Sequence, residues 1–120
     1  MYKILMVDDS ATVTAINKEA LESQGYEVIT ASDGEEGFKR AKLESPDLIL
    51  LDVMLPKLDG YMICRMLKYD EKYKNIPIIM LTAKASDQDR QTGKEVGADD
   101  FVVKGASIED LISIVKKHLK

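Results

Sequence analysis

Four short apolar runs in this chain each stop at a polar residue. The runs and their stops are residues 4–7 before Asp8 and Asp9, 48–51 before Asp52, 78–81 before Thr82, and 101–103 before Lys104. Continuous apolar runs of this length are typical of parallel strands covered on both faces. In open α/β sheets, ligands bind just beyond the carboxyl ends of such strands. Three carboxylates, one hydroxyl and one amine are therefore expected along one rim of a sheet.

Helical patterns alternate with these runs. A fifth strand is expected over residues 27–31, and helices are expected at about 34–42 and 108–119. Ser32 and Glu35 have capping-box spacing at the start of the first of these helices, and Ser107 and Asp110 have capping spacing at the start of the second. The apolar positions expected to face the core are Val13, Ile16, Ala20 and Leu21 in a first helix closed by Gly25, Phe38 and Ala41 in the second, and Met62, Ile63, Met66 and Leu67 in a third after Gly60. Strands alternating with helices predict right-handed βαβ crossovers and a doubly wound parallel sheet in one domain spanning residues 1–120.

The fourth helix is an exception to this amphipathic pattern. Residues 86–95 contain no large apolar side chain and include Gly93, which costs about 1 kcal/mol relative to alanine within a helix. We therefore expect this segment to be weakly held. Since low local stability suits elements that switch, it is a candidate for a mobile signalling surface.

Charge and composition exclude several classes of function. The 120 residues hold 17 Lys and Arg against 21 Asp and Glu, a net charge of −4 without a basic stripe, so direct nucleic-acid binding is not expected. The apolar runs are too short for a signal peptide or a membrane span, and a cytoplasmic location is expected. Cys64, the only cysteine, has no partner for a disulfide and is interpreted as a reduced structural thiol.

The polar stops suggest phosphoryl chemistry. Carboxylates 4 Å apart repel by about 1–4 kcal/mol per pair, depending on the dielectric, so a cation should lie between them. Oxygen ligands without histidine or cysteine favour Mg²⁺. Asp8 and Asp9 are suited to holding this ion, with the backbone carbonyl of Met54 as a further ligand. Asp52, alone at its strand end, is the expected nucleophile and would form an aspartyl phosphate.

Two further side chains suit the same reaction. The ammonium of Lys104 can neutralise one oxygen of the phosphoryl group, and the hydroxyl of Thr82 can donate a hydrogen bond to another.

Taken together, these motifs resemble the receiver domain of two-component response regulators over residues 3–119, close in plan to single-domain chemotaxis regulators. The matching segments are residues 7–10, 51–56, 59–60, 81–83 and 97–101, followed by Lys104. The resemblance implies a flavodoxin-like, five-stranded parallel sheet of order 2-1-3-4-5 with five helices. It also implies a signalling switch that catalyses only its own phosphorylation and dephosphorylation.

The resemblance further implies partners and a switching pair. A sensor histidine kinase or phosphotransfer protein would donate phosphate from a phosphohistidine to Asp52, with Mg²⁺ on Asp8 and Asp9. Phosphorylation would be coupled to Thr82 and Phe101 and would change contacts of the last strand and its flanking helices with a downstream effector. The kinase, the output, the oligomeric state, and whether the domain stands alone or belongs to a longer regulator are left open.

The chain differs from the family pattern in the two residues that follow Lys104. Gly105 and Ala106 follow Lys104, where family members usually carry proline and an aromatic residue. Without proline a cis peptide costs about 2.5–4 kcal/mol, so we predict a trans bond between Lys104 and Gly105 and a more flexible loop.

Two other functions compete with the receiver interpretation. One is a binding module of the same fold that works without phosphorylation. The other is a flavodoxin-type redox carrier, which is disfavoured because no Ser/Thr/Gly-rich phosphate cradle follows the first strand and because it leaves three acids unexplained. Among the remaining polar residues, Asp99 and Asp100 are expected to shape a turn, and His118 to face solvent at a helix end.

Overall fold

The computed structural model describes residues 1–82 and 87–119, and within this range the side chains of residues 87–90 are left undescribed. Ala83 and Ser86, which belong to two of the sequence patterns, lie outside it. The elements in chain order are β1 (Lys3–Val7), α1 (Ala11–Glu22), β2 (Glu27–Ala31), α2 (Gly34–Glu44), β3 (Leu48–Asp52), α3 (Gly60–Lys68), β4 (Ile78–Thr82), α4 (Asp87–Glu95), β5 (Asp100–Val103) and α5 (Ile108–His118). None of the described helices is long and apolar enough to cross a membrane.

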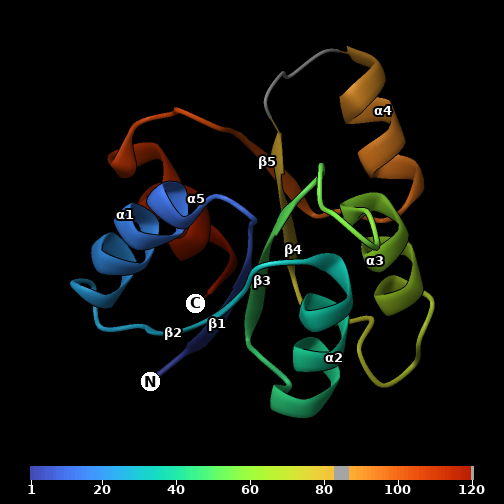
Figure 1. Cartoon of the computed structure of the whole chain (residues 1–120), viewed down its shortest axis with the longest axis horizontal. Coiled ribbons are helices and arrows are strands. Elements are labelled where there is room, and N and C mark those ends of the chain that lie inside the picture. The colour runs from blue at the N-terminus through green and yellow to red at the C-terminus, as the bar shows by residue number, and fades with distance from the viewer. Residues whose placement is uncertain (83–86, 120) are drawn as a thin grey trace.

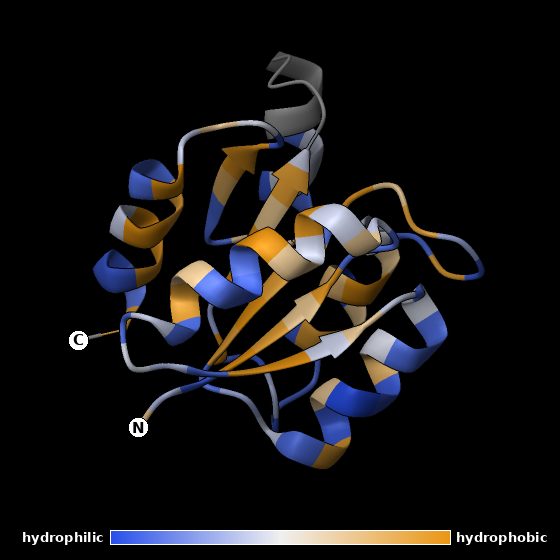
Figure 2. Cartoon of the chain, turned by 60° about the vertical axis from the view of Figure 1, so that its left-hand side comes forward, coloured by the Kyte–Doolittle hydropathy of each residue, from blue (hydrophilic) through white to orange (hydrophobic). Residues whose placement is uncertain are grey.

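The strands form one parallel sheet in the order β2-β1-β3-β4-β5, as the resemblance implied (Figure 1). Helices α1 and α5 cover one face, while α2 and α3 cover the other together with Val96 and Ala98, which follow α4. Figure 2 shows the apolar strands between helices whose polar surfaces point outward. This is the doubly wound arrangement predicted from the alternation of strands and helices.

Strand residues divide between the two faces by alternation. In β1, Leu5 and Val7 face α2 and α3, whereas Ile4 and Met6 face α1 and α5, and all four are buried. Side chains alternate along a strand, so a strand covered on both faces must be apolar throughout. The register pairs Val7 with Leu51, and Asp52 with Leu81. The carboxyl ends of the central strands are thus level, and the polar stops share one edge.

Two predicted core residues are in fact exposed. Ile16 is 53% exposed and Met62 is 49% exposed. At 100° per residue, the buried side of α3 runs through Ile63, Cys64 and Leu67, which places Met62 on the outer side. Ile16 lies at the edge of the stripe that ends at the buried Leu21. The apolar spacing was correct for both helices, but the chosen face was displaced.

The helix boundaries differ slightly from the predicted ones. Helix α2 begins at Gly34 as expected but is capped by Asp33, which accepts the backbone N–H of Glu36 at 2.9 Å; the Glu36 carboxylate accepts the N–H of Ser32 at 3.1 Å. The cap is therefore displaced by one residue from the predicted Ser32–Glu35 pair, and Glu36 bonds back to Ser32 and not to the capping residue Asp33. At α5 the predicted cap is confirmed, since the Ser107 hydroxyl accepts the N–H of Asp110 at 3.1 Å.

Cys64 is a free and fully buried thiol in α3, in agreement with a structural role. Burial raises its pKa to about 12, despite the nearby Lys68 ammonium. Because the thiolate is the reactive form, we expect Cys64 in the native protein to resist thiol-alkylating reagents at pH 8. It should react fully in denaturant, as followed by intact mass. Rapid native alkylation would contradict this account of the core.

Asp100 and His118 form a link between β5 and α5 in place of the expected turn and solvent-facing histidine. Asp100 Oδ2 lies 3.0 Å from His118 Nε2 and 3.6 Å from Lys117 Nζ. The His118 side chain is only 19% exposed. These two residues lie at the start of β5 and the end of α5, and only the docking of α5 against the sheet brings them together.

This link predicts a pH-dependent contribution to stability. Burial raises the pKa of Asp100, but the His118 hydrogen bond, the N–H of Phe101 and the Lys117 charge outweigh it, so the net pKa is lowered. A carboxyl whose folded pKa lies below its unfolded value stabilises the fold above the unfolded pKa and loses that effect as pH falls through the folded pKa. We expect Asp100→Asn to lower the free energy of unfolding by about 1 kcal/mol near pH 6, and we expect this difference to shrink as pH falls below about 3.9, the ordinary pKa of aspartate.

Urea denaturation at several pH values would measure the difference. Glu71→Gln, at a carboxylate 88% exposed, provides the control and should have little effect. A cost for Asp100→Asn that is constant from pH 3 to pH 6 would show that the charge of Asp100 is not the cause.

Candidate functional site

Lys104 joins two buried carboxylates at the edge where β1, β3 and β5 end. Its Nζ lies 2.6 Å from Asp52 Oδ2 and 3.2 Å from Asp8 Oδ1. These partners are 52 and 96 positions away in the sequence. The Asp52 and Asp8 side chains are 3% and 0% exposed. The parallel sheet therefore assembles the expected groups from distant segments.

The third carboxylate completes an acidic cluster. One oxygen each of Asp8, Asp9 and Asp52 lies within 4.8 Å of the others. Asp8 and Asp52 are buried, whereas Asp9 is exposed. Three carboxylates against one ammonium leave this edge negatively charged, a condition that a cation would relieve.

Asp8 carries the structural feature that tests whether a metal would fit. Its Oδ1 accepts the Ser10 N–H at 2.9 Å and the Lys104 ammonium. Its Oδ2 is buried and has no hydrogen-bond partner among the described residues. Buried polar atoms are usually paired, so this oxygen is available to a ligand. A hard cation with oxygen ligands fits the cluster.

The backbone after β3 orients Asp52. The Met54 N–H donates a hydrogen bond to Asp52 Oδ1 at 3.1 Å, while Asp52 Oδ2 accepts one from the Lys104 ammonium. Met54 as a whole is 75% exposed, and it contacts the site through its backbone N–H. A ligand role for the Met54 carbonyl remains a prediction.

At both Asp52 and Lys104, burial and the hydrogen-bonding partners shift the pKa in opposite directions. Burial raises the pKa of Asp52, as does the Asp8 charge, against the lowering effect of hydrogen bonds from Lys104 and Met54. For Lys104, burial lowers the pKa, but the hydrogen bonds and charges of the two carboxylates outweigh it and leave the pKa raised. Lys104 is thus held as an ammonium next to a carboxylate with a raised pKa.

Thr82 is the last residue of β4, and Phe101 lies in β5, the strand that leads to Lys104. Thr82 is 5% exposed, and its carbonyl accepts the Lys104 N–H at 2.7 Å, which links the ends of these strands. The half-buried Phe101 ring faces α4, because a Cβ built on Gly93 would lie 2.2 Å from the ring. Both positions are compatible with the switching roles that the resemblance implied, which remain predictions.

The peptide bond after Lys104 has the predicted trans configuration. The described residues contain no cis peptide bond, so the bond between Lys104 and Gly105 is trans as predicted. Gly105 has φ +90°, in the left-handed region that favours glycine.

Sequence reasoning missed the contribution of Ser10. Besides the N–H donated to Asp8, its hydroxyl accepts the Val13 N–H at 3.3 Å and so caps α1. A serine directly before a helical pattern is a recognisable capping signal that could have identified it.

A family model described as the response regulator receiver domain matches residues 4–116. The chain belongs to this family. Over 118 residues, the alkaline phosphatase synthesis transcriptional regulatory protein PhoP of Bacillus subtilis is 48% identical to this chain. That match covers 98% of this chain but 48% of PhoP. The receiver domain thus spans about half the length of the curated relatives it matches.

Solved receiver structures share the fold closely. The chemotaxis response regulator CheY4 of Vibrio cholerae superposes with a TM-score of 0.93 at 36% identity, covering 98% of each chain. The receiver domain of a sensor histidine kinase from Pseudomonas aeruginosa, with a magnesium ion coordinated in its active-site cleft, gives a TM-score of 0.88 at 33% identity, covering 97% of this chain and 95% of that one.

Proposed function

We propose that this receiver domain is a phosphoacceptor switch in which Asp52 takes a phosphoryl group in a Mg²⁺-dependent transfer. The main support for this proposal is the buried Asp52 carboxylate, which lies 2.6 Å from the Lys104 ammonium and close to the carboxylates of Asp8 and Asp9. A buried carboxylate next to a fixed positive charge can attack phosphorus while that charge neutralises the phosphoryl oxygens. The magnesium-bound receiver among the structural neighbours supports the choice of ion.

The protein groups have separate tasks in this reaction. A carboxylate oxygen of Asp52 forms the new bond to phosphorus as the phosphorus–nitrogen bond of a donor phosphohistidine breaks, and the proton required by the departing imidazole nitrogen comes from solvent. Lys104 stabilises one phosphoryl oxygen, and Thr82 can donate its hydroxyl to another. Mg²⁺, when bound by Asp8, Asp9, Asp52 and the Met54 carbonyl, would neutralise charge on the phosphoryl group. Water later cleaves the acyl phosphate and restores Asp52.

The proposed partners follow from the same chemistry. The donor is a cytoplasmic sensor histidine kinase or phosphotransfer protein that presents a phosphohistidine. The output is a change in contacts between the α4-β5-α5 surface and an effector protein or domain. This surface is connected to the site, because Lys104 follows β5 and Phe101 in β5 packs against α4.

Phosphoryl incorporation tests the proposal directly. With acetyl phosphate as a small donor, intact mass should show one added phosphoryl group in Mg²⁺ and none in excess EDTA. Incorporation that is independent of a divalent cation would contradict the metal assignment. No incorporation under either condition would contradict the phosphoacceptor role and favour the phosphorylation-independent binding module.

A further inference from the structure

The loop between β3 and α3 contains an unusual turn close to Asp52. Lys57 has φ +70°, and the Leu58 N–H donates to the Pro56 carbonyl across it at 2.8 Å. A hydrogen bond spanning one residue with positive φ defines a classic γ-turn, which is rare and strained for a residue with a Cβ. Such a turn persists only when its surroundings hold it.

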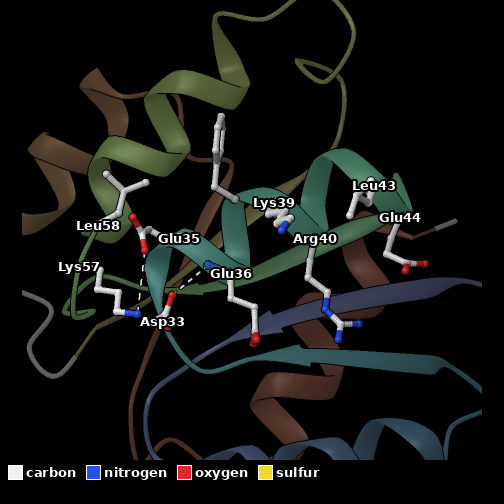
Figure 3. A pocket seen from close by; sticks show the side chains of 10 residues that line it. Asp33, Glu35, Glu36, Lys39, Arg40, Leu43, Glu44, Lys57 and Leu58 are labelled. Carbon is white, nitrogen blue, oxygen red and sulfur yellow. Dashed lines mark hydrogen bonds and ion pairs between the residues drawn. The ribbon is translucent and has the colours of Figure 1, made fainter.

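The surroundings that hold this turn are the first residues of α2. The Gly34 N–H donates to the Pro56 carbonyl at 3.2 Å. A Cβ built on Gly34 would lie 1.7 Å from the Leu58 carbonyl oxygen, a distance that requires the loop to move. Lys57 Nζ also lies 3.6 Å from Asp33 and 4.0 Å from Glu35 (Figure 3).

The backbone contact has more influence than these ion pairs. The Lys57 side chain is 60% exposed, and exposed ion pairs contribute little. The approach of Gly34 to Leu58, by contrast, is an excluded-volume constraint that water and salt do not weaken. Gly34 is therefore the residue that sets how closely α2 and the loop pack.

The other end of the loop leads into the acidic cluster. The Met54 N–H donates to Asp52, and the Gly60 N–H donates to the Val53 carbonyl at 3.0 Å. The loop is thus attached at its two ends to β3 and α3, and in the middle to α2. A displacement at Leu58 must be absorbed by the few residues between it and Met54.

From these contacts we propose that Gly34 is a positioning residue for the metal site: by packing against the Lys57 turn, the start of α2 holds the Met54 backbone where it orients Asp52 and offers its carbonyl. This inference rests on the proposed function for the identity of the ion as Mg²⁺, but not for the effect on Met54. Gly34 touches none of the reacting groups itself.

Two measurements on Gly34→Ala test the proposal. Without metal, the ¹H–¹⁵N resonance of the Met54 amide should move toward values of a weaker hydrogen bond. In a Mg²⁺ titration followed by NMR, the dissociation constant should rise about tenfold or more, the usual scale for groups that support metal ligands. Gly25→Ala provides the control, because it introduces the same methyl group at a strained position (φ +92°) in the turn before β2, with no atom within 4 Å of its built Cβ. It should lower stability and change neither measurement.

A pair of substitutions at Lys57 tests the same idea without touching α2, in case Gly34→Ala fails to fold. Lys57→Gly and Lys57→Val remove the same charge, but only glycine accepts the positive φ. Lys57→Gly should keep the wild-type Met54 resonance and Mg²⁺ affinity, whereas Lys57→Val should reproduce the effects of Gly34→Ala.

The possible results separate the two proposals. Unchanged Met54 resonances in both Gly34→Ala and Lys57→Val would overturn the positioning role. Equal losses in both Lys57 variants would also overturn it, because they would assign the effect to the ammonium. If the wild type binds no Mg²⁺, the proposed function fails, while the Met54 resonances still decide whether α2 positions the loop.

Discussion

Asp52→Ala is expected to abolish phosphoryl incorporation from acetyl phosphate in Mg²⁺, as measured by intact mass. The substitution removes the buried carboxylate that lies 2.6 Å from the Lys104 ammonium. Asp52 ends β3, the strand at the centre of the sheet. The protein should remain folded. Burial raises the pKa of Asp52, which means that its charged form is disfavoured in the folded state, and Lys104 keeps Asp8 as a partner.

A matched control lies at the opposite end of the same strand. Asp47 directly precedes β3 and is exposed; its carboxylate accepts the Lys3 N–H at 2.7 Å. Asp47→Ala should be phosphorylated like the wild type. If Asp52→Ala incorporates as much phosphate as this control, another residue is the acceptor and the assignment of Asp52 is wrong.

Leu50→Ala is expected to cause the largest loss of stability among single substitutions considered for this protein. Leu50 is 0% exposed in the middle of β3, within the core beneath α1 and α5. Truncating a buried leucine loses its transfer free energy and leaves a cavity, at a cost of about 2–5 kcal/mol. Urea denaturation followed by circular dichroism would measure the free energy of unfolding.

Leu43→Ala removes the same atoms from the surface of α2, where Leu43 is 73% exposed. Its expected cost is within about 0.5 kcal/mol. A Leu50→Ala cost below 1 kcal/mol would mean that the core collapses around the deleted atoms, or that β3 is not the central strand.

The fold was predictable because local pattern and global arrangement agree. A run such as residues 48–51 has no polar position, so its strand must be covered on both faces, and the alternating helices supply the cover. Helix positions were harder to place. Ile16 and Met62 satisfied an apolar spacing but lie outside the buried stripe, because the choice of face depends on the partner element and not on the helix alone.

The polar contacts between distant elements were not predictable. His118 could be recognised as the end of a helix, yet its pairing with Asp100 depends on how α5 lies across β5. In the same way, the capping spacing before Gly34 was visible in the sequence, but the contact of Gly34 with Leu58 exists only because α2 and the loop after β3 meet in space.

The sequence by itself determined the strand order through its family motifs, the shared edge of the polar stops, and the chemical types available there: carboxylates, a hydroxyl and an amine. These follow from strand periodicity and from the rule that parallel strands present their carboxyl ends together. Only the tertiary structure decided that Lys104 spans Asp8 and Asp52, that Asp8 keeps one buried oxygen unpaired, and that α2 holds the loop beside Asp52. The reason is that these contacts depend on distances of a few ångströms between segments far apart in the chain, which residue spacing does not encode.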